Sequence, residues 1–63
     1  MVETLRATVE RTACDLKMPP WLVATWYAKE IEAGRVRVRR IPAELAVDHF
    51  RALAWEWLLE EPL

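Results

Sequence analysis

Prolines and a single glycine divide this chain into three segments that can each form a helix. A residue before proline is pushed away from helical backbone, and proline lacks the N–H that a helix interior requires. Pro19 and Pro20 follow the first apolar segment, Gly34 follows the second, and Pro42 precedes the third. This punctuation predicts three short helices in place of one long helix.

The first and third segments both have apolar residues every three or four positions, as on one face of a helix. In the first, predicted to be helical over residues 2–17, they are Val2, Leu5, Val9, Ala13 and Leu16. Arg6 and Glu10 lie four apart on its outer side and can pair weakly. The third helix should run from Pro42 to Glu61, because Pro62 follows. Its inward positions are Leu45, Ala46, Phe50, Leu53, Ala54, Trp57 and Leu58.

The second segment predicts a helix from Pro20 to about Ala33, with Gly34 as its left-handed C-terminal cap. Apolar side chains cover most of its circumference and leave only a narrow polar line. A helix that is apolar nearly all round is buried from more than one side. This helix is therefore expected to be central or to form a subunit interface, and Trp26 is expected to be a core residue.

A short alternating segment follows the second helix. Val36 and Val38 point to one side, whereas Arg35, Arg37 and Arg39 point to the other, which is the period of a β-strand. A lone strand leaves its backbone hydrogen-bonding groups unpaired. Two arrangements solve this: pairing with the same segment of a second subunit, or an irregular wing whose backbone binds water.

The chain is short for the apolar surface that it has. It contains 63 residues, of which 54% are hydrophobic and four are tryptophan, more than one small core is expected to cover. We expect one domain over residues 1–63 with a mostly α fold: three helices with one short basic β-strand or wing between helices two and three. We also expect a homodimer, whose candidate interface residues are Trp21, Trp26, Trp55 and Leu59.

The sequence offers little support for a catalytic or metal site. It has no serine, one histidine and one cysteine, and Cys14 and His49 fall on different predicted helices. We expect neither an enzyme nor a cofactor or metal. No apolar run approaches the roughly 18–20 residues that span a bilayer, so a cytoplasmic protein without a membrane partner is expected. The absence of asparagine and glutamine beside many charged residues suggests a thermophilic source.

Positive charge is concentrated in one place. The formal net charge is −1, yet Arg35, Arg37, Arg39 and Arg40 supply four positive charges within six residues, which leaves −5 for the other 57 residues. Arginines on alternate strand positions, about 6.6–7 Å apart, can bind phosphates or base edges. We expect these four arginines and Lys29 to contact nucleic acid. A charged edge that prevents aggregation, or docking to an acidic protein, would use the same arginines.

A family resemblance follows from two stretches. The stretch ERTACDLKMPPWLVATWYAKEIEAGRVRVRR resembles the helix-turn-helix and the start of the wing in winged-helix regulators, and RRIPAELAVDHF is similar to the segment after the wing in excisionase-like and MerR-like DNA-binding proteins. The resemblance implies that the helix from Pro20 to Ala33 is the recognition helix and that Arg35 to Arg40 form the wing. A ribbon-helix-helix-like pairing of Arg35 to Ile41 across a dimer is a further possibility.

Two functional hypotheses follow. The first is a small DNA-binding protein, either a transcriptional regulator or an architectural factor, that contacts nucleic acid through Arg35 to Arg40. The alternative is a helical protein–protein interaction module, antitoxin-like or adaptor-like, that uses the helix from Pro20 to Ala33 with Trp55 and Leu59. DNA binding is favoured if the arginines face away from the excess apolar surface, and a protein partner is favoured if both lie on one surface.

Overall fold

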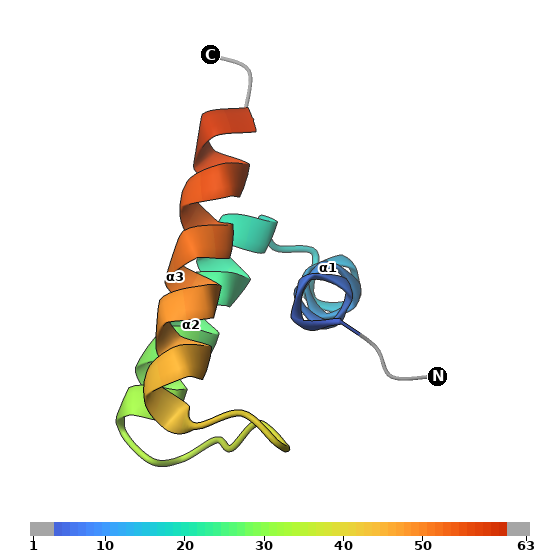
Figure 1. Cartoon of the computed structure of the whole chain (residues 1–63). Coiled ribbons are helices and arrows are strands. Elements are labelled where there is room, and N and C mark those ends of the chain that lie inside the picture. Colours follow the sequence, from blue (N-terminus) through green and yellow to red (C-terminus); the bar gives the residue numbers. More distant parts are fainter. Residues whose placement is uncertain (1–3, 61–63) are drawn as a thin grey trace.

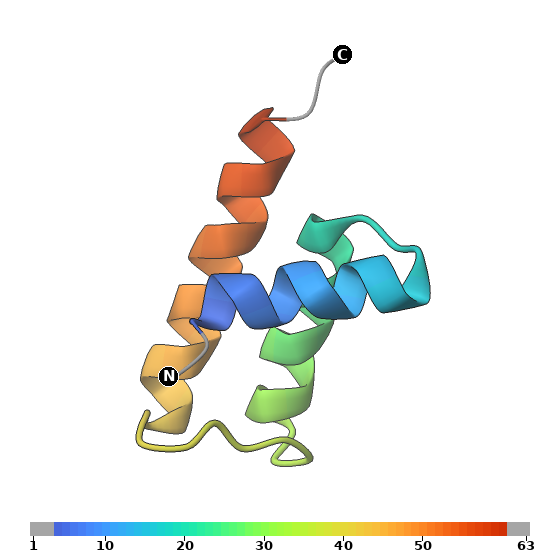
Figure 2. The same cartoon turned by 90° about the vertical axis from the view of Figure 1, so that its right-hand side faces the viewer.

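A computed structural model describes residues 4–60, which form three helices and their connections. The helices are α1 (Leu5–Leu16), α2 (Pro20–Glu32) and α3 (Ala43–Glu60). α2 and α3 lie side by side and antiparallel, and α1 crosses one face of this pair (Figures 1 and 2). The expected mostly α architecture of three helices is confirmed for this part of the chain.

α1 is defined by a cap at each end. The Thr4 hydroxyl oxygen accepts a hydrogen bond from the Ala7 N–H at 3.1 Å, which satisfies one of the unpaired N–H groups of the first turn. At the other end, the Met18 N–H donates to the Ala13 carbonyl at 2.9 Å while Lys17 takes the left-handed conformation with φ 55°. This is a Schellman motif, here formed with lysine in place of glycine.

α2 ends in the same motif, and here the sequence predicted it. Gly34 has φ 80°, its N–H donates to the Ile31 carbonyl at 3.0 Å, and the Arg35 N–H donates to the Glu30 carbonyl at 2.9 Å. A Cβ atom at Gly34 would meet nothing within 4 Å. Glycine is therefore favoured here by its backbone conformation and not by lack of space.

The other predicted boundaries are close to the observed ones. α2 ends at Glu32, one residue before the expected end, and α3 begins at Ala43, one residue after the expected start. The expected first residue of helix one, Val2, and the expected last residue of helix three, Glu61, lie outside the described residues.

The core lies where α1 crosses the α2–α3 pair. Tyr27 of α2 stacks on Phe50 of α3 with ring centroids 5.1 Å apart, and its hydroxyl lies 3.2 Å from that of Thr12 in α1. One aromatic pair therefore contacts all three helices. The buried side chains are Val9, Ala13, Val23, Ala24, Ala28, Ile31, Ala46, Val47, Phe50, Leu53, Ala54 and Trp57.

Some residues expected in the apolar stripes are exposed. Leu16, Leu45 and Leu58 were expected to face inward, but 59%, 60% and 41% of their respective surfaces are exposed. Leu16 and Leu45 lie in the last and first turns of their helices. Figure 2 shows that α1 crosses only part of the α2–α3 pair, so it cannot bury the whole length of either apolar stripe.

The expectation that Trp26 is a core residue is wrong. The buried face of α2 consists of Val23, Ala24, Ala28 and Ile31, whereas Trp26 on the opposite side is 49% exposed. The Trp26 ring meets the neighbouring Tyr27 ring edge to face, with centroids 5.0 Å apart, and lines a hollow with Thr12 and Leu16 of α1. In a single chain, α2 therefore keeps an apolar side that is only partly covered.

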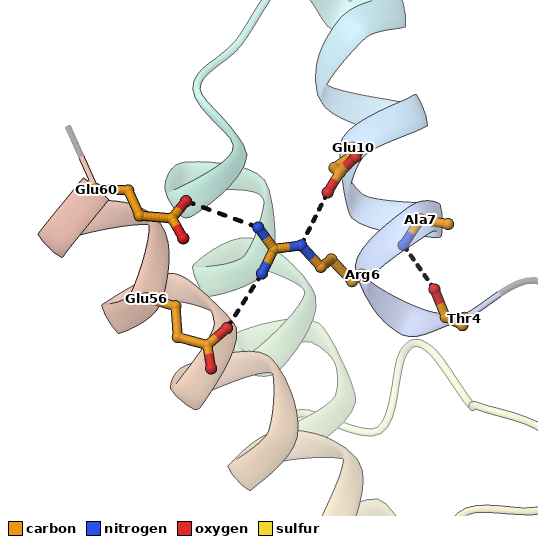
Figure 3. A network of polar contacts seen from close by, with 6 residues as sticks. All are labelled: Thr4, Arg6, Ala7, Glu10, Glu56 and Glu60. Atoms are coloured by element: carbon orange, nitrogen blue, oxygen red, sulfur yellow. Dashed lines mark hydrogen bonds and ion pairs between the residues drawn. The ribbon is translucent and has the colours of Figure 1, made fainter.

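An arginine on α1 links this helix to α3. Arg6 pairs with Glu10, as the sequence predicted, and reaches across to Glu56 at 3.2 Å and Glu60 at 3.7 Å (Figure 3). Its guanidinium also lies over the ring of Trp57. The two contacts to glutamates of α3 were not predicted, because nothing in the sequence places residues fifty positions apart side by side.

Candidate nucleic-acid interface

The arginine-rich connection between α2 and α3 runs across the end of the helix pair at which α2 stops and α3 starts (Figures 1 and 2). Val36, Val38 and Ile41 are half-buried and pack on the core, whereas Arg37 and Arg39 are exposed. The predicted alternation between inside and outside is therefore present. It places the two arginines on the solvent side of an anchored segment.

The expected β-strand does not form in the described part of this single chain, residues 4–60. Its backbone has no second extended segment to pair with, because the three helices and their caps use the rest of that chain. The anchoring of residues 36–41 thus comes from side chains and not from a hydrogen-bonded ladder. Pairing with the same segment of a second copy stays a prediction.

A turn at Arg39 and Arg40 ends the extended part. Arg40 has φ 65°, in the left-handed region, which costs an L-residue with a Cβ atom about 1–2 kcal/mol. This backbone reverses direction just before α3 begins. Arg39 and Arg40 are both exposed at this turn, on the same connection as Arg37.

Arg35 differs from the other arginines of the segment because it has a partner. Its Nε and one terminal nitrogen donate to the two carboxylate oxygens of Glu30, the second contact at 3.2 Å. This bidentate bond lowers the pKa of Glu30, and the attraction of the Arg35 charge lowers it further, whereas burial of the carboxylate acts in the opposite direction. The same bond raises the pKa of Arg35. Arg35 therefore fastens the segment to α2, in addition to its backbone bond to the same residue.

Arg37, Arg39 and Arg40 make no ion pair within residues 4–60, whereas Arg6 and Arg51 each pair with glutamates. Their charges are not neutralised by a neighbouring carboxylate, so their potential extends into solvent. Lys29, the fifth expected contact, is exposed in the last turn of α2. The three arginines share one connection and form the candidate site, whereas Lys29 lies on α2 and its contact with nucleic acid stays a prediction.

A hollow of about 430 Å³ lies between the start of α1 and this segment. We call it the basic hollow. Its lining residues are Thr4, Leu5, Thr8, Tyr27, Val36, Arg37, Val38, Arg39, Ile41 and Phe50. The floor is apolar and aromatic, and two guanidinium groups with two threonines stand around it. The sequence did not reveal this hollow, because the packing of α1 over residues 36–41 is tertiary.

Two apolar surfaces lie away from the arginines. On the last turns of α3, Trp55, Leu58 and Leu59 have the spacing of one helix face and are 66%, 41% and 81% exposed. On the outer side of α2, Trp26 is half-exposed with Leu22. Of the four expected interface residues, Trp26, Trp55 and Leu59 are thus exposed. Trp21 is half-buried and packs against the core.

Other kinds of site find no support in residues 4–60. No group of three or more histidine, cysteine, aspartate or glutamate side chains is placed to hold a metal ion. None of α1, α2 and α3 combines the length and the hydropathy that a membrane-crossing helix needs. Comparison of the chain with protein-family models, curated proteins and solved structures finds no match.

Proposed function

We propose that this protein binds nucleic acid, DNA first, through Arg37, Arg39 and Arg40. The supporting observation is that these three guanidinium groups have no carboxylate partner within residues 4–60, on a segment held in place by inward-facing valines. Exposed, anchored arginines bind phosphates with little loss of backbone freedom. The segment acts as the contact surface, and Arg35 acts as its fastening.

The residues at the start of α2 favour contact through the connection over contact through α2 as a recognition helix. The N-terminal residues of a recognition helix read base edges. In α2 these are Pro20, Trp21 and Leu22, which offer no hydrogen-bonding side chain except the indole N–H. Binding is therefore dominated by phosphate contacts, with low sequence specificity, as for an architectural factor.

A salt series with a short random duplex tests this proposal. Each phosphate contact that arginine makes contributes about 0.9 to the slope of log K against log salt concentration. Arg37→Gln with Arg39→Gln should therefore lower the steepness of that slope by about 1.8. The matched control is Arg11→Gln with Arg51→Gln, which removes the same net charge from α1 and α3.

The control pair should leave the slope close to that of the unmodified protein. Equal weakening by both double variants would mean that only net charge matters, and the assignment to the segment would fall. If the unmodified protein does not bind duplex or single-stranded DNA at 20–50 mM salt, roughly the range where phosphate contacts are strongest, nucleic-acid binding itself is refuted.

A second candidate function, a protein–protein interaction module that includes self-association, is favoured by the exposed face of α3. Trp55, Leu58 and Leu59 form one apolar patch at the helix end that projects beyond α1 and α2 (Figure 1). Exposed patches of this kind mark protein interfaces. We propose a homodimer through this patch, with the arginines left on the opposite end of α3 for nucleic acid.

Sedimentation velocity at micromolar concentrations tests the dimer. Trp55→Ala with Leu59→Ala should convert a dimer to a monomer, whereas Leu45→Ala, which removes a leucine that is 60% exposed elsewhere on α3, should not. A monomer for the unmodified chain at about 100 μM would exclude a dimer of useful affinity.

A further inference from the structure

The basic hollow stands directly beside the arginines that are proposed to bind phosphate. Arg37 and Arg39 line it, and so do Leu5 and Tyr27 on the opposite side. Its volume of about 430 Å³ falls within the range of about 300–1,000 Å³ that small-molecule sites occupy. Binding of a duplex through its phosphates does not require such a hollow.

We infer that the basic hollow takes one unstacked nucleobase while Arg37 and Arg39 bind the adjoining phosphates, so that the preferred ligand is single-stranded nucleic acid. This inference rests on the proposed function and names the form of its ligand. A base within a duplex is stacked on both faces and paired at its edge, so it cannot enter a hollow without being extruded at a cost of a few kcal/mol. A single strand presents its bases without that cost.

The lining of the hollow has the composition that a base requires. Leu5, Val36 and Val38 provide apolar contact, and Tyr27 adds an aromatic ring that stacks on Phe50. Proteins that bind single strands without strong sequence preference combine such apolar and aromatic surface with a basic groove. Guanidinium groups can also stack on a base.

A threonine adds hydrogen-bonding capacity at the wall of the hollow. The Thr4 hydroxyl oxygen accepts from the Ala7 N–H at 3.1 Å. A hydroxyl oxygen has a second lone pair, so it can accept another bond. Amino groups on a base edge can donate that bond. The hollow thus offers apolar contact, an acceptor and cations within one space.

The test compares three DNA ligands of one length by fluorescence anisotropy, each labelled at its 3′ end: a 12-nucleotide single strand, the same backbone without bases, and a 12-base-pair duplex. The single strand is expected to bind about 10-fold more tightly than the abasic strand, in line with one buried base. The duplex is expected to bind like the abasic strand. Arg37→Gln with Arg39→Gln should weaken all three.

A variant that fills the hollow separates base binding from phosphate binding. Thr8→Phe places a ring in the hollow without changing charge, and it should remove the 10-fold preference for the base-bearing strand over the abasic strand. Circular dichroism and the melting temperature establish whether the variant folds. The comparison of base-bearing and abasic strands in the unmodified protein needs no variant, so equal binding overturns the inference even if Thr8→Phe is unfolded.

Each outcome has one meaning. Equal binding of the three ligands, or tighter binding of the duplex, overturns the inference and leaves the proposed function standing. No binding of any ligand at low salt overturns both. A preference for the base-bearing strand that Thr8→Phe does not reduce in a folded variant shows that the base binds elsewhere, and this also overturns the inference.

Discussion

The guanidinium of Arg6 in α1 lies 5.0 Å from the centre of the Trp57 ring in α3. The same group pairs with glutamates on both helices, as Figure 3 shows. α1 packs on the α2–α3 pair less extensively than those two helices pack on each other. Arg6 is therefore a principal link between α1 and α3, although its side chain is 41% exposed.

Replacing Arg6 should loosen α1 before it unfolds the molecule. Arg6→Met keeps the apolar stem and removes a cation–π contact worth about 0.5–1 kcal/mol and several exposed ion pairs worth about 0–1 kcal/mol in all. We expect a loss of about 1 kcal/mol in urea denaturation and faster amide exchange in α1 than in α3. The control, Arg51→Met, removes one exposed pair with Glu32 and should cost less than about 0.5 kcal/mol. Equal losses would contradict this role.

The pair between Glu30 and Arg35 should make stability depend on pH in acid. Because the folded protein lowers the pKa of Glu30 below its ordinary value of 4.5, the pair stabilises the fold above that value and loses its effect as the pH falls through the lowered pKa. Glu30→Gln should therefore lower the melting temperature at pH 7 and have no effect at a pH well below 4.5. Arg35→Gln should show the same profile. A melting-temperature difference that persists in acid would exclude this pair as its cause.

The left-handed residues Arg40 and Lys17 allow stability to be separated from binding. Glycine at either position should stabilise the protein by about 0.5–1 kcal/mol, because relief of about 1–2 kcal/mol of backbone strain exceeds the extra entropy of glycine in the unfolded chain. Both substitutions remove one positive charge. Only Arg40→Gly should weaken nucleic-acid binding, because Lys17 lies at the end of α1 away from the segment. Weaker binding by both variants would point to net charge.

The two aromatic side chains Phe50 and Trp26 should differ in what their truncation costs. Phe50 is 1% exposed, so Phe50→Ala should destabilise the protein by about 3–5 kcal/mol. Trp26 is 49% exposed, so Trp26→Ala should cost about 1–1.5 kcal/mol in chemical denaturation of the monomer. A larger loss that grows with protein concentration would reveal that Trp26 is buried by a second copy.

Local signals in the sequence predicted the helices well, because proline and glycine act within a few residues. Gly34 adopts the expected left-handed cap, and the break at Pro19 and Pro20 separates α1 from α2. Periodicity predicted which faces are apolar, but it could not predict how much of each face is covered. Coverage depends on where α1 crosses, and that left Trp26 and Leu45 outside the core.

The candidate site was predictable as a list of residues but not as an arrangement. The alternation of valine and arginine correctly placed Arg37 and Arg39 outward. It could not show that Arg35 is bound to Glu30, a contact that depends on how the chain leaves the capped end of α2. The basic hollow could not be predicted from the sequence either, because Thr4 and Thr8 approach the arginines only when α1 lies over residues 36–41.

Along the connection between α2 and α3, the residues that anchor the backbone are separate from those that face outward. This separation bears on which substitutions the protein can accept. Val36, Val38 and Ile41 hold the segment on the core, while the side chains of Arg37, Arg39 and Arg40 are exposed. No sheet ladder in the described residues holds this segment, so its position depends on the three anchoring side chains. Substitutions at the outward positions leave these anchors unchanged. The three-helix body can therefore serve as a scaffold on which selection or design exchanges the outward side chains of this segment without rebuilding the fold.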